Sequence, residues 1–160
     1  RSINAQMTLD NTPGLGASEA EARGPVRTLI VEDDVPLRDT IQRTVDRIGG
    51  FQASYTDKAS EALYLLRRSK DQGQPVELVF SDLGLADGPA GGFTIAKAVK
   101  TEGLASYFVS FTGSAKRITP EQIEQAGINR VVDKSDWSLS LRDVLGQVRE
   151  AILHPNPQTS

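Results

Sequence analysis

The sequence has no cysteine and only one histidine among its 160 residues. Disulfides, thiolate nucleophiles and cysteine-based zinc sites are therefore excluded. The single histidine, His154, lies next to a proline near the end of the chain, which leaves little material for Ser-His-Asp catalysis or for multi-histidine metal sites. Any chemistry that the chain performs must rest mainly on carboxylates.

Long apolar runs and an excess of positive charge are absent as well. No apolar run approaches the roughly 18 residues that a membrane span requires. The formal net charge is −3, so the overall field gives no reason to expect binding to nucleic acid. Hydrophobic residues make up 38% of the chain and charged residues 24%, which is typical of an ordinary globular domain. We therefore expect a cytoplasmic protein with no direct nucleic-acid partner and no membrane partner.

The chain divides into one expected folded region and two tails. Residues 1–24 mix small and polar side chains with no sustained apolar period, which predicts a flexible extension or linker. Residues 154–160 contain two prolines and predict a second flexible tail. The folded domain is expected to span residues 25–153, a length typical of one globular unit.

Within the expected domain, strand-like and helix-like segments alternate five times. Short aliphatic runs predict the strands, and apolar residues at helical spacing, such as Leu37, Ile41 and Val45, predict the helices. The predicted strands are 26–31, 51–55, 76–80, 107–111 and 131–132, and the predicted helices are 37–48, 59–69, 93–101, 119–125 and 139–152, with a glycine-rich loop at 84–92. This alternation predicts a doubly wound α/β fold with a five-stranded parallel sheet and helices on both faces.

Polar side chains follow four of the five predicted strands. Glu32 and Asp33 follow the first strand, Asp82 the third, Thr112 the fourth and Lys134 the fifth. Ligands of open parallel sheets bind beyond the carboxyl ends of the strands, so we expect these side chains to converge at one edge of the sheet.

The residue types in this expected cluster suit a divalent cation and a phosphoryl group. Carboxylate oxygens are the ligands that Mg²⁺ prefers, and a bound cation would relieve the repulsion between crowded carboxylates. If one carboxylate attacks a phosphoryl donor, an ammonium group and a hydroxyl could bind the phosphoryl oxygens. Taken alone, residues 32–34 could instead be a solvated helix-capping cluster, and Asp82 a turn former.

Four segments resemble, in order and spacing, the receiver domain of two-component response regulators and hybrid histidine kinases. They are 29–34 (LIVEDD), 79–88 (VFSDLGLADG), 109–113 (VSFTG) and 131–134 (VVDK). The resemblance covers about residues 26–153 and implies the flavodoxin-like (βα)5 fold of the receiver type. It also implies that Asp82 accepts a phosphoryl group, in a Mg²⁺-dependent reaction, from a histidine kinase or a histidine phosphotransfer protein.

The resemblance assigns roles to the other site residues and to one surface. Glu32 and Asp33 would organise the metal, the Gly84 carbonyl would be a further ligand, Thr112 would be the switch hydroxyl and Lys134 would contact the phosphoryl group. Such a domain is not an enzyme of the usual kind but catalyses its own phosphorylation and dephosphorylation. Phosphorylation would alter the face built by the fourth helix, fifth strand and fifth helix, through which the chain could also form a homodimer.

Three positions depart from the family pattern. Ser135 follows the lysine where the family often has proline, which leaves open whether the Lys134–Ser135 bond is cis. Val131 stands where an aromatic switch residue is common, and Ala86 replaces a frequent proline. The departures at Val131 and Ala86 favour an alternative function, in which the fold is a docking module that works without phosphorylation. The presence of Asp82, Thr112 and Lys134 argues against that alternative.

Two other function classes fit the sequence less well. A phosphatase of the haloacid dehalogenase type would need a second carboxylate two residues after the nucleophile, and that position is Gly84. A dinucleotide-binding domain would need a Gly-x-Gly-x-x-Gly turn after the first strand, which this sequence lacks.

Overall fold

The computed structural model describes residues 23–83, 91–113 and 118–155. Five strands form one sheet: β2 (Val26–Val31), β3 (Phe51–Thr56), β4 (Leu78–Ser81), β5 (Tyr107–Thr112) and β6 (Arg130–Asp133). Their order across the sheet is β3-β2-β4-β5-β6, and every neighbouring pair is parallel. The predicted doubly wound α/β architecture is therefore confirmed.

Helices follow the strands along the chain. They are α2 (Val35–Ile48), α3 (Ala59–Asp71), α4 (Gly91–Glu102), α5 (Pro120–Ala126) and α6 (Trp137–Leu153), with a short 3-10 turn, η3 (Lys134–Asp136), before α6. None of the helices in the described part of the chain combines the length and hydropathy that a bilayer crossing requires.

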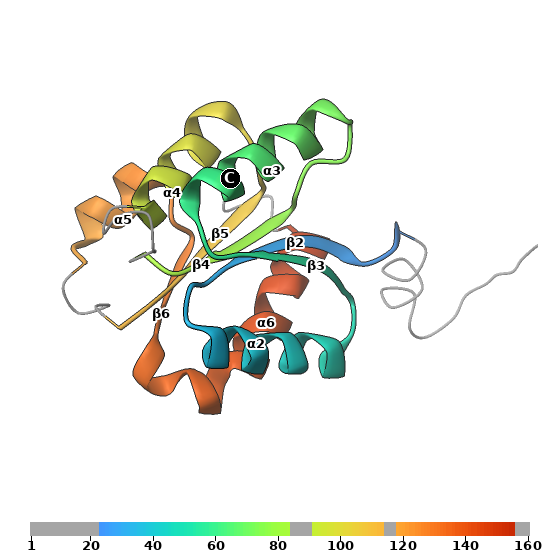
Figure 1. Cartoon of the computed structure of the whole chain (residues 1–160), viewed down its shortest axis with the longest axis vertical. Helices are drawn as coiled ribbons and strands as arrows, with labels where there is room; N and C mark the ends of the chain where they lie inside the picture. Colours follow the sequence, from blue (N-terminus) through green and yellow to red (C-terminus); the bar gives the residue numbers. More distant parts are fainter. Residues whose placement is uncertain (1–22, 84–90, 114–117, 156–160) are drawn as a thin grey trace, which may run out of the picture.

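The helices cover both faces of the sheet. In Figure 1, α3, α4 and α5 lie on one face, and α2 and α6 lie on the other. Side chains of a strand alternate between the two faces, so Leu29 and Val31 of β2 pack beneath α3, α4 and α5, whereas Val26 and Ile30 pack beneath α2 and α6. A sheet buried on both faces requires the nearly continuous apolar runs that predicted β2 and β4.

Local signals fix the ends of two helices. Asp34 has an extended backbone, and its side chain accepts a hydrogen bond from the Leu37 amide at 3.4 Å, which caps the start of α2. Gly49 ends α2 with a φ of 74°, in the left-handed region that favours glycine. Thr119 and Gln122 form the predicted capping box at the start of α5.

Five predicted boundaries are wrong by two residues. Three are helix ends that extend further than the apolar spacing showed: α2 begins at Val35 rather than 37, α3 ends at Asp71 rather than 69, and α6 begins at Trp137 rather than 139.

The other two wrong boundaries are the starts of β4 and α4. β4 begins at Leu78 rather than at residue 76, because the backbone bends at Glu77, whose buried carboxylate accepts a hydrogen bond from the Arg27 amide at 3.0 Å. α4 begins at Gly91, inside the stretch predicted as a loop. A Cβ atom at residue 92 would lie 2.4 Å from the Asp82 carbonyl oxygen, so close packing requires glycine there despite its low helix propensity.

Candidate functional site

The predicted site residues lie at one edge of the sheet, where the parallel strands have their carboxyl ends. Glu32 and Asp33 follow β2, Asp82 follows β4, Thr112 ends β5 and Lys134 follows β6. Because β2 neighbours β4, β4 neighbours β5 and β5 neighbours β6, residues from distant parts of the sequence meet here. The contacts below show which of these side chains the fold brings together.

Three carboxylates crowd together at this edge. Glu32, Asp33 and Asp82 each place a carboxylate oxygen within 4.8 Å of the others. Glu32 is only 1% exposed and Asp82 only 7% exposed, so water screens their charges poorly. Like charges at this spacing destabilise one another, and the cluster therefore favours a bound cation or a bound proton.

Lys134 supplies positive charge to the cluster. Its Nζ lies 2.9 Å from Asp82 Oδ2 and 3.1 Å from Glu32 Oε1. Hydrogen bonds on either side of Lys134 stabilise the turn that contains it. The Asp133 carboxylate accepts hydrogen bonds from the Ser135 amide at 2.9 Å and from the Ser135 hydroxyl at 2.8 Å. The Lys134–Ser135 peptide bond is trans.

Burial and charge shift the pKa values of two groups in the cluster. Desolvation raises the pKa of Glu32 to about 7, although the Asp34 amide and the Lys134 ammonium both favour the charged carboxylate. Burial acts against the Lys134 ammonium, but its hydrogen bond to Asp82 and the charges of Glu32 and Asp82 outweigh that cost and raise its pKa. The ammonium is thus held in its charged form between two carboxylates.

Backbone contacts fix the position of Asp82. The Asp82 amide donates to the Val31 carbonyl at 3.0 Å, and the Asp82 carbonyl accepts from the Ser81 hydroxyl at 2.8 Å. The Gly92 amide donates to the Leu83 carbonyl at 3.1 Å, which holds the first turn of α4 against the same segment. Sequence analysis did not assign Ser81 or Gly92 to the site. The signal for Gly92 was a glycine pair directly before an amphipathic helix.

Two hydroxyl side chains of β5, those of Thr112 and Ser110, lie next to β6. Thr112 is buried, and its register partner on β6 is Asp133. Two residues earlier on β5, the buried hydroxyl of Ser110 has no hydrogen-bond partner among the described residues. The register partner of Ser110 is Val131, which packs half-buried beneath α3, α4 and α5. Sequence analysis did not identify Ser110, since a serine within a strand does not reveal whether its hydroxyl will be paired.

The carboxylate cluster has the donor chemistry that Mg²⁺ needs. A hard divalent cation takes oxygen ligands and uses one or two carboxylates while keeping several waters. Glu32 Oε1 is buried and accepts no hydrogen bond from the described residues, although the Lys134 ammonium lies 3.1 Å away. Such an oxygen is suited to a second cation. Gly84, the predicted carbonyl ligand, and Ala86 lie outside the described residues.

Comparison with solved structures identifies the fold. The receiver domain of a putative Luxo repressor protein from Vibrio parahaemolyticus matches with a TM-score of 0.66 and 18% identity, over 80% of this chain and 92% of that one. The phosphorylated cyanobacterial phytochrome response regulator RcpA matches with a TM-score of 0.67 and 16% identity, over 83% and 97%. The receiver domain of the histidine kinase CKI1 from Arabidopsis thaliana, complexed with Mg²⁺ and BeF3⁻, matches with a TM-score of 0.59 and 22% identity, over 83% and 95%.

Sequence comparison alone identifies no relative: no protein-family model matches the chain, and no curated protein matches it. The structural matches cover nearly the whole length of the receiver domains. The chain therefore has the (βα)5 fold of the receiver domains of two-component response regulators.

Proposed function

We propose that this chain is a phosphoacceptor domain of a two-component signalling pathway, with Asp82 as the acceptor. One observation carries the proposal: the Lys134 ammonium lies 2.9 Å from Asp82 Oδ2, within a cluster of three carboxylates at the carboxyl edge of the sheet. A turn-forming aspartate would need neither a half-buried lysine in contact with it nor two more carboxylates beside it. The receiver-domain fold of the chain supports the same function.

The transfer step uses Asp82 as the nucleophile. One carboxylate oxygen attacks the phosphorus of a phosphohistidine on a histidine kinase or a histidine phosphotransfer protein. The new O–P bond forms as the N–P bond breaks, and the imidazole nitrogen leaves with the bonding electron pair. Hydrolysis reverses the modification: water attacks phosphorus, the Asp82 carboxylate leaves, and inorganic phosphate is released.

The surrounding residues manage the charge of this step. Glu32, Asp33 and Asp82 would hold Mg²⁺, with the Gly84 carbonyl as a further ligand, and the bound cation would offset the repulsion between the carboxylate and the incoming phosphoryl oxygens. Lys134 already contacts Asp82 and is placed to pair with a phosphoryl oxygen. Thr112 ends the neighbouring strand, from which its hydroxyl would bind a second phosphoryl oxygen.

Phosphorylation would be read out at a surface. Replacing a carboxylate with an acyl phosphate adds negative charge beside Lys134 and Thr112. Thr112 ends β5, which precedes α5 along the chain, and Lys134 begins η3, which precedes α6. A shift of either residue would therefore alter the face formed by α5, β6 and α6. We propose this face as the site where an effector, or a second copy of the chain, senses the phosphorylated state.

A second function is favoured by Val131. At this position β6 presents an aliphatic side chain beside Ser110, so no aromatic ring can couple the site to the surface from there. A domain without that coupling could serve as a docking module whose binding does not depend on phosphorylation. Whether Asp82 accepts a phosphoryl group decides between the two functions.

The test is intact mass spectrometry after incubation with Mg²⁺ and acetyl phosphate. The proposal predicts a gain of one phosphoryl group that disappears in Asp82→Asn and when Mg²⁺ is removed by a chelator. Asp143→Asn, at an exposed position on α6, is the matched control and should keep the gain. A folded protein that gains no mass under any condition would contradict the proposal and favour the docking module.

A further inference from the structure

The two edges of the sheet differ in how they are protected against pairing with another strand. β6 forms one edge and is short, with charged residues at both ends, Arg130 and Asp133. β3 forms the other edge with six residues, Phe51–Thr56, none of which is charged or proline. Short length, charge and proline are the usual means by which proteins keep edge strands from pairing. β3 has none of the three.

Within the described part of the chain, no strand pairs with the outer side of β3. The Gly50 and Thr56 carbonyls accept hydrogen bonds from the Val26 amide and the Glu32 amide, so the even-numbered residues of this segment point their backbone groups toward β2. Alternate residues of a strand point their backbone groups in opposite directions. The N–H and C=O groups of Phe51, Ala53 and Tyr55 therefore face away from the sheet.

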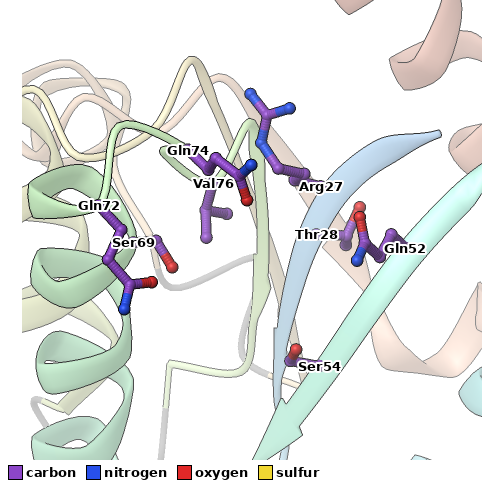
Figure 2. A pocket seen from close by; sticks show the side chains of 8 residues that line it. All are labelled: Arg27, Thr28, Gln52, Ser54, Ser69, Gln72, Gln74 and Val76. Atoms are coloured by element: carbon purple, nitrogen blue, oxygen red, sulfur yellow. The ribbon is translucent and has the colours of Figure 1, made fainter. Parts of the chain in front are cut away.

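Among the described residues, helices cover the side chains of this edge only in part. Gln52 and Ser54 are exposed, and Figure 2 shows both beside a hollow of about 150 Å³ that separates β3 from the end of α3, where Ser69 and Gln72 lie. On the opposite face of β3, Phe51 and Tyr55 are only half-buried. The strand is thus accessible from the side and from the hollow.

We propose that β3 pairs antiparallel with β3 of a second copy of this chain, which joins the two sheets into one. With the two-fold axis at Ala53, Phe51 of each copy lies opposite Tyr55 of the other, and Gln52 lies opposite Ser54. Every opposed pair is then aromatic with aromatic, polar with polar or alanine with alanine, and no charge is buried. In this register the outward-facing backbone groups of the two strands form about six hydrogen bonds.

The occupant is a second copy because the strand is complementary to itself. The small Ala53 side chain at the axis allows the two backbones to approach, and aromatic pairs across strands add to the stability of a sheet. Six residues extend only about 20 Å, so the pairing gives a reversible dimer rather than an obligate one. β2 separates this edge from β4, so Asp82 stays open to a donor in the dimer, and the inference is independent of the proposed phosphoryl transfer.

The test is sedimentation equilibrium of the full 160-residue chain at concentrations up to about 500 μM, where weak dimers become populated. The wild type should self-associate. Gln52→Lys with Ser54→Lys places like charges opposite each other across the axis and should raise the dissociation constant at least tenfold. Gln52→Lys with Ser54→Glu places opposite charges there and should restore the dimer. Both positions are exposed, so neither variant should unfold the chain.

Gln125→Lys serves as the control, since it adds a charge to an exposed position on α5 at the far side of the sheet. It should leave the dimer intact. A wild type that stays monomeric throughout would overturn the proposal. A dimer that survives the two lysines, or one that Gln125→Lys breaks, would also overturn it and would place the interface elsewhere.

Discussion

Replacing Glu32 with glutamine should stabilise the metal-free protein, and the gain should grow with pH. The carboxyl group is 1% exposed, and desolvation raises its pKa from 4.5 to about 7. The folded protein therefore binds this proton more tightly than the unfolded chain does, so its contribution to the free energy of unfolding is lost as the pH rises from about 4.5 to about 7. Glutamine has the shape of the protonated acid and does not titrate.

The size of the effect follows from the pKa. A rise from 4.5 to about 7 corresponds to about 3 kcal/mol, at about 1.4 kcal/mol for each pKa unit. This shift is a net value that already includes the attraction of the Lys134 ammonium for the charged carboxylate, so about 3 kcal/mol is the most that the substitution can gain. We expect Glu32→Gln to be about 1 to 3 kcal/mol more stable than the wild type at pH 8 and nearly equal to it at pH 4.5.

Urea denaturation in the presence of a chelator, at several pH values, measures this difference. Glu150→Gln, which removes an exposed carboxylate from α6, should follow the wild type at every pH. Parallel profiles for Glu32→Gln and the wild type, offset by a constant or not at all, would refute the argument that burial holds a proton on Glu32.

Three further predictions concern the residues around the site. Lys134→Met should slow phosphorylation by acetyl phosphate about 100-fold, measured as the initial rate of mass gain, because it removes the ammonium 2.9 Å from Asp82; an unchanged rate would exclude Lys134 from the reaction. Gly92→Ala should cost about 1 to 3 kcal/mol in urea denaturation because the new Cβ meets backbone atoms at 2.4 Å. Gly146→Ala is the comparison: its new Cβ would meet nothing within 4 Å, so the free energy of unfolding should rise by up to about 1 kcal/mol. If Gly92→Ala were the more stable of the two variants, the close packing of Gly92 against Asp82 would be contradicted. Ser110→Ala should raise the free energy of unfolding by about 1 kcal/mol by removing a buried unpaired hydroxyl, whereas a loss would mean that the hydroxyl has a partner.

The fold follows from the sequence where local signals and burial agree. The aliphatic run at residues 26–31 predicted β2 with the bounds that the structure has. The helical spacing from Leu37 to Ile48, followed by Gly49, predicted the end of α2 correctly. The start of α4 did not follow, because Gly91 and Gly92 are typical loop residues by composition. Close packing of Gly92 against Asp82 is a tertiary constraint that local propensity does not contain.

The site was predictable as a set of residue types but not as a set of contacts. The rule that parallel strands present ligand-binding groups at their carboxyl ends placed Glu32, Asp82 and Lys134 together. The packing of the strand ends determines the distances between these side chains and the burial of Glu32. It also determines the hydrogen bond from the Ser135 amide to the Asp133 carboxylate. Whether the Ser110 hydroxyl finds a hydrogen-bond partner likewise depends on its neighbours on adjacent strands, which no local sequence pattern predicts.

The central claim is that Asp82 carries the phosphoryl group, and chemical trapping tests it most directly. Hydride reduction of an aspartyl phosphate converts that side chain to homoserine, which tandem mass spectrometry of peptides can locate. After reaction with acetyl phosphate and Mg²⁺, followed by borohydride, we predict homoserine at position 82 and at no other acidic residue. Homoserine at position 32 or 33, or at none, would contradict the account.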